Sequence, residues 1–373
     1  MAGIYIHIPF CKQACYYCDF HFSTSLKNKD ALINAIILEI QQRKSAWNKH
    51  EFDTIYFGGG TPSIVDFQDI AKIIESIDKT YRLHKKAEIT LEANPDDLNE
   101  NKLREFKQIG INRLSIGIQS FFEEDLKKLN RSHNARQATT SILTAQDIGF
   151  NNISIDLIYG IPGLTDDKWQ KNIQKVTDLK ISHVSAYALT VEKKTVLAHQ
   201  IDKKIFPPIS DRQAAKQFEY LIQNLQKKEF LHYEISNFGK PEALSLHNAN
   251  YWKNIPYLGL GPAAHSYKDG KRRWNISNNA LYIKNLVSNL YFKEEILGKK
   301  EIYNELIMTG LRTMWGINLK KIKALDVDLQ QFILKSAKKY IDQNLLFIED
   351  DHLKAFPKAW FVIDGIISDL FWV

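Results

Sequence analysis

The chain has 373 residues, of which 44% are hydrophobic and 25% charged, as in an ordinary globular protein. It is long enough for one large domain and a smaller one. The net charge is +7, but lysines and arginines are interspersed with acidic residues, which favours a solvated surface over a nucleic-acid site. No apolar run reaches the ~18 residues of a membrane span and the N-terminal residues lack a signal-peptide pattern, so we expect a cytoplasmic protein without a membrane span.

Up to about residue 190, short apolar segments alternate with longer amphipathic ones. The predicted strands are Gly3–Ile8, Thr54–Phe57, Glu88–Ala93, Arg113–Ile118, Ile153–Tyr159 and His183–Leu189. The predicted helices between them include Ala31–Arg43, Phe67–Ile77, Lys102–Ile109, Ala135–Ile148 and Asp167–Leu179. Strand–helix repeats at this spacing predict an α/β fold with a parallel sheet, either open or partly closed into a barrel.

Polar side chains alternate with apolar ones along several predicted strands. The polar positions are Tyr5 and His7, then Thr90, Glu92 and Asn94, then Ser115, Gly117 and Gln119, and finally Ser154 and Asp156. In a barrel such a face points inward, and functional groups gather at the C-terminal ends of the strands. Glu92, Gln119 and Asp156 all fall late in their strands. We therefore expect them to share a pocket, although any one of them alone could be a structural polar group.

The pattern changes after Pro207 and Pro208. A strong helix over Asp211–Lys228 is followed by short strands and turns up to Trp274. The remainder is mostly helical, with helices at Asn279–Leu290, Lys300–Met314, Leu329–Gln343 and Ile363–Leu370 and a hairpin made of Leu345–Ile348 and His352–Phe356. This order resembles a winged-helix-like module. We divide the chain into a barrel (residues 1–230), a connecting region (231–295) and a C-terminal module (296–373).

The only three cysteines, Cys11, Cys15 and Cys18, lie within eight residues directly after the first predicted strand. An odd, clustered set argues against a disulfide framework. A zinc site usually takes four ligands in two pairs, so a zinc or copper loop is the minor alternative here. Three thiolates around a four-iron cluster leave one iron open, which the amino and carboxylate groups of S-adenosylmethionine (SAM) could occupy.

The spacing C-x₃-C-x₂-C after a first barrel strand resembles that of the radical SAM superfamily. The preceding Tyr5-Ile6-His7-Ile8-Pro9-Phe10 resembles the segment that opens the oxygen-independent coproporphyrinogen III oxidase (HemN) group. The resemblance covers nearly the whole chain and is strongest to the HemW branch, the haem chaperones. It implies a partial (β/α)₆ radical SAM barrel with a C-terminal, mainly helical module. It also implies a [4Fe–4S] cluster on the three cysteines, with one or two SAM molecules.

Further residues resemble SAM-contacting positions of the coproporphyrinogen oxidase group. Gly59-Gly60-Thr61 follow the second predicted strand, where glycines let a ligand approach the backbone, although alone they indicate only a tight turn. Arg131 could pair with a carboxylate or be an exposed helix-end residue. The SAM-contacting set implied by the resemblance is Tyr5, Tyr17, Gly59, Gly60, Thr61, Glu92, Gln119, Arg131, Asp156, Ala188 and His265.

Two departures separate the chain from the oxidases. Their motif continues to a fourth cysteine, where this chain has Phe20, and they carry an N-terminal extension, whereas this chain begins four residues before Tyr5. A segment from His247 to Trp252 matches the pattern H-N-x-x-Y-W, which is associated with haem binding in the HemW branch. An imidazole can ligate haem iron and aromatic faces can cover a macrocycle. His247 could equally be a structural residue that bonds to the backbone.

The resemblance thus implies a protein that binds haem and transfers it to an acceptor protein, such as a respiratory one, with no residue assigned a catalytic role. SAM cleavage would then serve only to gate transfer. The alternative is an enzyme that decarboxylates coproporphyrinogen III to protoporphyrinogen IX through a radical derived from SAM. A tRNA-modifying radical SAM enzyme, raised by the basic charge, fits the resemblance poorly.

Overall fold

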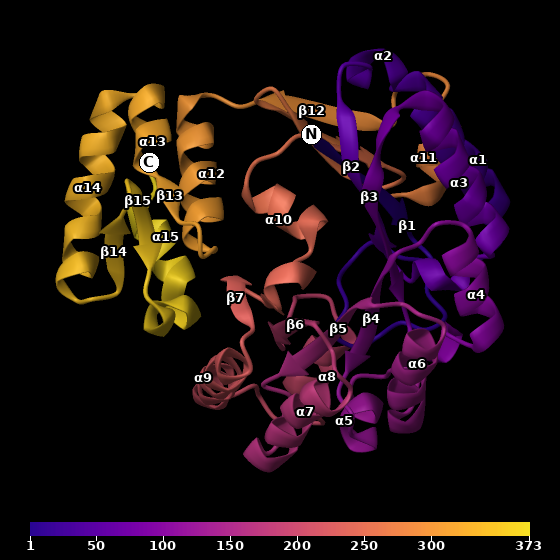
Figure 1. Ribbon diagram of the computed structural model, residues 1–373, viewed down its shortest axis with the longest axis horizontal. Coiled ribbons are helices and arrows are strands. Elements are labelled where there is room, and N and C mark those ends of the chain that lie inside the picture. Colours follow the sequence, from indigo (N-terminus) through magenta and orange to yellow (C-terminus); the bar gives the residue numbers. More distant parts are fainter.

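A mainly parallel sheet forms the centre of the larger part of the computed structural model, which describes residues 1–373 (Figure 1). Its six parallel strands pair in sequence order: β1 (Ala2–Ile8), β2 (Glu51–Gly59), β3 (Arg82–Ala93), β4 (Arg113–Gln119), β5 (Asn152–Tyr159) and β6 (His183–Ala188). The helices among and after them are α1 (Lys29–Gln42), α2 (Lys44–Trp47), α3 (Phe67–Thr80), α4 (Glu100–Gln108), α5 (Glu123–Lys128), α6 (Ala135–Asp147), α7 (Asp166–Asp178), α8 (Val196–Asp202) and α9 (Asp211–Lys227). The predicted strand–helix repeats are confirmed.

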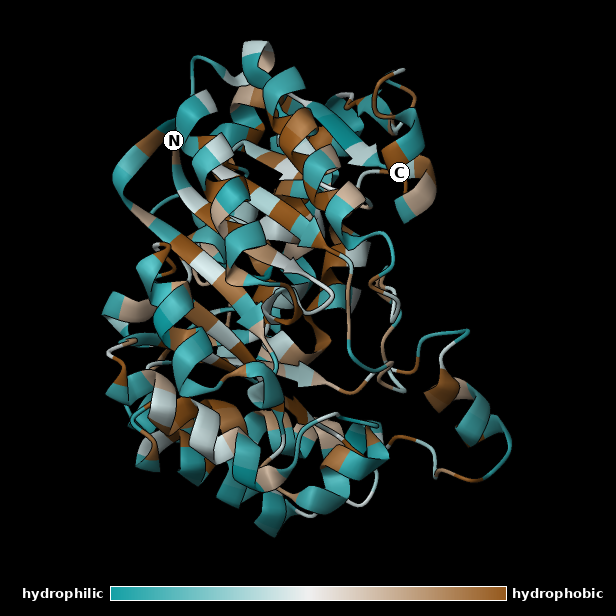
Figure 2. Cartoon of the chain, turned by 90° about the vertical axis from the view of Figure 1, so that its right-hand side faces the viewer, coloured by the Kyte–Doolittle hydropathy of each residue, from teal (hydrophilic) through white to brown (hydrophobic).

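The alternation of side chains along the strands sets the two faces of the sheet. Ile4, Ile6 and Ile8 of β1 are fully buried in the main core, because one face of each strand packs against the helices. Figure 2 shows hydrophilic residues dominating the outer faces of the helices, with apolar residues concentrated on the strands and beneath the helices. The polar face is left for the interior of the partial barrel, where the site lies.

Both edges of the sheet are extended by residues after 230. β7 (Leu231–Glu234) and β8 (Asn237–Gly239) form a hairpin beside β6, and β9 (Tyr257–Leu260) pairs in parallel with β1. Beyond β9 lie the antiparallel strands β10 (His265–Lys268), β11 (Lys271–Asn275) and β12 (Phe292–Ile296), with α11 (Asn279–Asn285) before the last of them. Helix α10 (Leu246–Trp252) connects the two edges. Residues 231–296 are thus built into one twelve-stranded sheet.

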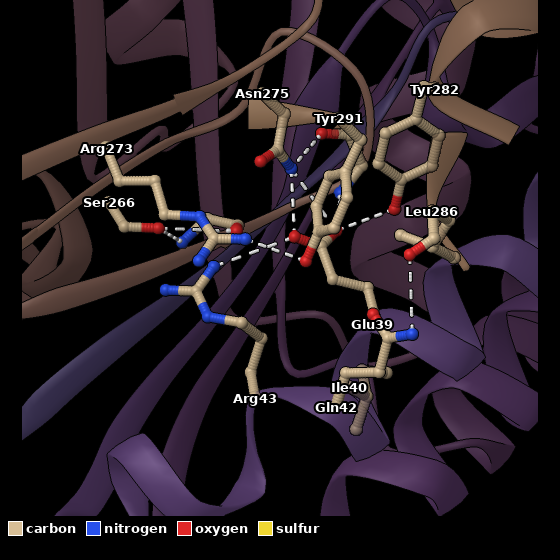
Figure 3. Close-up of polar contacts among 12 residues, drawn as sticks. Glu39, Ile40, Gln42, Arg43, Ser266, Arg273, Asn275, Tyr282, Leu286 and Tyr291 are labelled. Atoms are coloured by element: carbon tan, nitrogen blue, oxygen red, sulfur yellow. Dashed lines mark hydrogen bonds and ion pairs between the residues drawn. The ribbon is translucent and has the colours of Figure 1, made fainter. Parts of the chain in front are cut away.

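A buried carboxylate on α1 fixes this extension against the barrel (Figure 3). Glu39 is fully buried. Its oxygens accept hydrogen bonds from the backbone N–H of Gly261 at 2.9 Å, from the Tyr282 hydroxyl at 2.6 Å and from the Asn275 amide at 3.0 Å. The Arg43 guanidinium lies 3.6 Å away. A buried charge is tolerated only with such partners, so the network holds the β9–α11 segment in one position.

The C-terminal module has a core of its own and lies beside the barrel (yellow in Figure 1). It comprises α12 (Lys299–Leu311), β13 (Ile317–Asn318), α13 (Leu319–Leu325), α14 (Val327–Asp342), β14 (Leu346–Glu349), β15 (His352–Ala355) and α15 (Ile363–Leu370). Helices followed by a hairpin and a last helix were the predicted order. Trp360, which precedes α15, packs in the main core rather than in the core of this module, and its ring centroid lies 4.0 Å from that of His232. No helix is both long and apolar enough to cross a bilayer.

Candidate functional site

The three cysteines lie on the loop between β1 and α1, where the C-terminal ends of the parallel strands meet. All three are partly exposed. Backbone hydrogen bonds fix the loop: the Cys11 N–H donates to the Ser23 carbonyl at 3.0 Å, and the Tyr16 N–H donates to the Leu129 carbonyl at 3.2 Å. The loop is therefore anchored on both sides.

A glycine turn after β2 runs against this loop. The Gly60 N–H donates to the Ile8 carbonyl at 2.9 Å, and the Thr61 N–H donates to the Phe10 carbonyl at 2.7 Å. A Cβ at Gly60 would lie 2.6 Å from the Phe10 carbonyl oxygen, closer than any side chain tolerates. The turn also brings the Thr61 hydroxyl to 3.6 Å from the Cys11 Sγ.

Arg131 crosses from the loop after α5 to the cluster loop. Its guanidinium donates to the Asn94 side chain at 2.6 Å and to the Gly117 carbonyl at 2.8 Å. It also lies 3.3 Å from the Cys15 Sγ and 3.4 Å from the Tyr17 hydroxyl. Arg131 is thus a half-buried, hydrogen-bonded residue rather than an exposed one at a helix end, and its pairing with a carboxylate stays a prediction.

Two carboxylates, Glu92 on β3 and Asp156 on β5, lie on the polar face of the sheet. Glu92 accepts hydrogen bonds from the Tyr56 hydroxyl at 2.8 Å and from the Gly59 N–H at 3.2 Å. Burial raises the pKa of Glu92 to about 7 and that of Asp156 to about 6. Near neutral pH both groups are therefore close to titration, and a bound cation would ionise them.

The backbone at the end of β4 is unusual. Gln119 has a φ of 64°, a left-handed conformation that is uncommon for a residue with a side chain. The pairing of β4 with β5 shifts in register just before it. Such outliers concentrate where a side chain must be aimed at a ligand, and Gln119 lines the cavity.

One cavity of about 810 Å³ brings most of the predicted residues together. Its lining includes Cys11, Cys15, Cys18, Tyr17, Gly59, Gly60, Thr61, Glu92, Gln119, Arg131, Asp156 and Ala188. Phe20, in the position of the fourth oxidase cysteine, also lines it and is 71% exposed. The predicted residues Tyr5, His247 and His265 are absent from this lining.

Tyr5 and His265 occupy other places in the fold. The Tyr5 hydroxyl lies 3.1 Å from the His7 Nδ1, below the cavity, and the Tyr5 ring stacks on that of Tyr56. His265 is exposed on β10, with its ring stacked against Trp274. Both residues were assigned to SAM by resemblance, and their contact with SAM stays a prediction.

His247 lies deep in the fold and is only 2% exposed. Its Nδ1 lies 2.8 Å from the Thr54 hydroxyl and its Nε2 lies 2.9 Å from the Tyr251 hydroxyl. Both ring nitrogens are thus engaged within the protein. In this conformation His247 has a structural role, and its role as a haem ligand stays a prediction.

The far wall of the cavity could not be predicted from the sequence. Phe218 of α9 and the segment containing Trp360, Phe361 and Asp364 before and within α15 complete the lining. In the sequence these residues look like ordinary amphipathic positions, and the docking of the C-terminal module brings Trp360, Phe361 and Asp364 to the cavity.

The donor set fits an iron–sulfur cluster with SAM. Burial raises the pKa of Cys11 to about 11 and also raises that of Cys18, so ionised thiols here need a bound cation. No three or more metal-ligating side chains lie close enough together to bind a single metal ion. A four-iron cluster is larger than one ion, so its thiolate ligands lie further apart. The carboxylates in the lining outnumber its one guanidinium, which suits SAM with its sulfonium and ammonium; they are Asp19, Glu92, Asp156, Glu192 and Asp364.

Comparison with known proteins agrees with this site. Residues 5–176 match the model of the radical SAM superfamily, and residues 297–362 match that of the HemN C-terminal domain. Heme chaperone HemW of Lactococcus lactis is 34% identical over 358 residues, which are 95% of this chain and 93% of the relative. Heme chaperone HemW of Bacillus subtilis is 35% identical over 86% of each chain.

A more distant relative and a solved structure extend the comparison. The radical S-adenosyl methionine domain-containing protein 1, mitochondrial, of Bos taurus is 30% identical over 99% of this chain and 87% of its own length. The structure of coproporphyrinogen III oxidase (HemN) from Escherichia coli superposes with a TM-score of 0.85 at 20% identity, over 99% of this chain and 90% of that one, which shows a shared fold. The chain therefore belongs to the HemW family of the radical SAM superfamily.

Proposed function

We propose that this protein is a haem chaperone, which binds haem and passes it to an acceptor protein. In this proposal it carries a [4Fe–4S] cluster on Cys11, Cys15 and Cys18, with SAM at the open iron. The observation that carries the proposal is identity over nearly the full length with relatives named heme chaperone HemW. The cavity that gathers the cysteines with most of the SAM-contacting set supports the cofactor assignment.

The chain's own residues have definite tasks in this proposal. When bound, the cluster supplies an open iron and an electron for the sulfonium of SAM. Carbonyl groups of the turn at Gly59 and Gly60 accept the ammonium, since glycines there let the ligand approach. Glu92 and Asp156 accept hydrogen bonds from the ribose or the ammonium. The Arg131 guanidinium lies 3.3 Å from the Cys15 Sγ, in the lining of the same cavity.

Phe20 argues against the oxidase alternative. It stands at the cavity where the oxidases carry a further cysteine, and an aromatic ring offers neither a thiolate nor an exchangeable proton.

The test is a haem titration of the anaerobically reconstituted protein, with an oxidase assay in parallel. We expect a saturable Soret band, loss of that haem to an added apo-haem protein, and no product from coproporphyrinogen III with SAM and reductant. Formation of protoporphyrinogen at enzymatic turnover would contradict the chaperone function, as would the absence of haem binding.

His247 is the haem ligand that the H-N-x-x-Y-W motif predicts. To reach iron it must release Thr54 or Tyr251, since both of its ring nitrogens are engaged. Ligation therefore requires movement of α10. A changed Soret spectrum in His247→Ala would support this assignment, and an unchanged affinity and spectrum would assign the iron to another ligand without removing the function.

A further inference from the structure

Below the cavity, the interior of the partial barrel is closed by layers of aromatic rings. Helix α10 contacts β1 and β2 and places His247 at the N-terminal end of these strands, where a Cβ on Gly3 would lie 3.2 Å from its Nδ1. Tyr5 and Tyr56 form the next layer, with the Tyr56 ring stacked 5.0 Å from that of His247 and 6.1 Å from that of Tyr5. Barrel interiors are filled by such layers of inward side chains.

Hydrogen bonds and stacking join these layers into a column that reaches the cavity. At its base His247 is held between the Thr54 and Tyr251 hydroxyls, at 2.8 and 2.9 Å. Its ring stacks on Tyr56, whose hydroxyl donates to the Glu92 Oε1 at 2.8 Å. The other Glu92 oxygen accepts from the Gly59 N–H at 3.2 Å. The carboxylate at the top is thus oriented from below.

We propose that Tyr56 and His247 are positioning residues of the SAM site, which fix Glu92 through this column. The inference rests on the proposed function, because it takes SAM as the ligand of Glu92. It assigns His247 of α10 a task that the motif alone does not indicate: its ring closes the barrel and stacks on Tyr56. Neither residue contacts the cavity, so each acts through Glu92.

The pKa of Glu92 provides a way to test the column, because several charged and titratable groups surround this carboxylate. They are Tyr5 on β1, Tyr56 on β2, Asp156 on β5, Tyr187 on β6 and Tyr251 on α10. Burial raises the pKa of Glu92, the Tyr56 hydrogen bond lowers it, Asp156 raises it and the Gly59 N–H lowers it. Removing the Tyr56 hydroxyl therefore moves this pKa upward, and ionisation of Glu92 then requires a higher pH.

The experiment measures SAM affinity as a function of pH in reconstituted proteins of equal cluster content. We expect Tyr56→Phe to bind SAM about fivefold more weakly at neutral pH, as for one lost hydrogen bond, with the midpoint of the pH profile shifted upward. His247→Ala should also weaken SAM binding, and His247→Gln should restore part of the affinity, because an amide can bond both Thr54 and Tyr251.

Tyr303→Phe is the matched control. It removes a buried tyrosine hydroxyl that donates to the Leu370 carbonyl at 3.0 Å in the C-terminal core, and it should keep the wild-type affinity for SAM. Wild-type affinity and an unshifted pH midpoint in Tyr56→Phe would overturn the inference even if His247→Ala fails to fold. Absence of SAM binding by the wild type would instead overturn the proposed function, and the inference with it.

Discussion

At Gly60 the turn after β2 passes so close to the cluster loop that a side chain has no room. A Cβ there would meet the Phe10 carbonyl at 2.6 Å, and the Thr61 N–H donates to that same carbonyl. We predict that Gly60→Ala destabilises the protein by about 2 kcal/mol, the scale of overpacking, and weakens SAM binding, measured by urea unfolding and a SAM titration.

Gly365 supplies the control for that substitution. It lies in α15 and a Cβ there would meet nothing within 4 Å, so Gly365→Ala should stabilise the protein by up to about 1 kcal/mol. Equal effects of the two substitutions would contradict the role of the close turn.

Glu92 makes the stability depend on pH. Burial raises its pKa from the ordinary 4.5 to about 7. Between these values the folded protein holds a proton that the unfolded chain has released, so stability falls as pH rises through this window. Buried His247, whose pKa burial lowers to about 3, acts with the opposite sign. We therefore predict that the SAM-free wild type loses more stability than Glu92→Gln between about pH 4.5 and 7, measured by urea unfolding; parallel curves would contradict this.

At the residue scale, site residues could be predicted from the sequence where their spacing alone indicates their chemistry. Cys11, Cys15 and Cys18, and the late strand positions Glu92 and Asp156, are brought to one cavity. Sequence reasoning could not find that Gln119 needs a φ of 64°, because a backbone conformation of this kind depends on the register of the neighbouring strand. Nor could it find that both nitrogens of His247 are engaged, since Thr54 lies far away in the chain and the contact with Tyr251, four residues on, depends on the segment forming a helix.

At the scale of elements, the alternating strands and helices could be predicted as far as β6 because each unit repeats a local pattern. The edges of the sheet could not. β9 pairs with β1 across about two hundred and fifty residues, and strands β7 to β10 are no longer than four residues. Such short strands carry little periodicity, and their positions are set by partners such as Glu39 rather than by their own sequence.

The docking of the C-terminal module is the element contact that completes the cavity. Trp360 is 4% exposed, packs with its ring tilted against that of His232, and lines the cavity. We predict that Trp360→Ala costs about 3–5 kcal/mol of folding free energy and weakens ligand binding in the cavity, measured by urea unfolding and by SAM titration. Trp372→Ala, at a 41% exposed position, should change stability by no more than about 0.5 kcal/mol. A similar small effect at Trp360 would contradict the docking role.

At the scale of the whole molecule, the two proposals give His247 two tasks, as the haem ligand and as a support of the column below Glu92. If this residue ligates haem, it must leave the column below Glu92, so haem binding should weaken SAM binding, and SAM should weaken haem binding by the same factor. We predict a coupling of about fivefold or more in haem titrations with and without saturating SAM, and its loss in His247→Ala. Identical haem affinity in the two titrations would contradict the coupling.

In the proposed function, the three cysteines hold a cluster with one iron open to SAM. The most direct measurement is the electron paramagnetic resonance spectrum of the reduced, anaerobically reconstituted protein, recorded before and after addition of SAM. We expect a [4Fe–4S]⁺ signal that SAM alters in the wild type and that is absent from Cys11→Ala, Cys15→Ala and Cys18→Ala. A wild-type signal that SAM leaves unchanged, or a full signal in all three variants, would contradict this expectation.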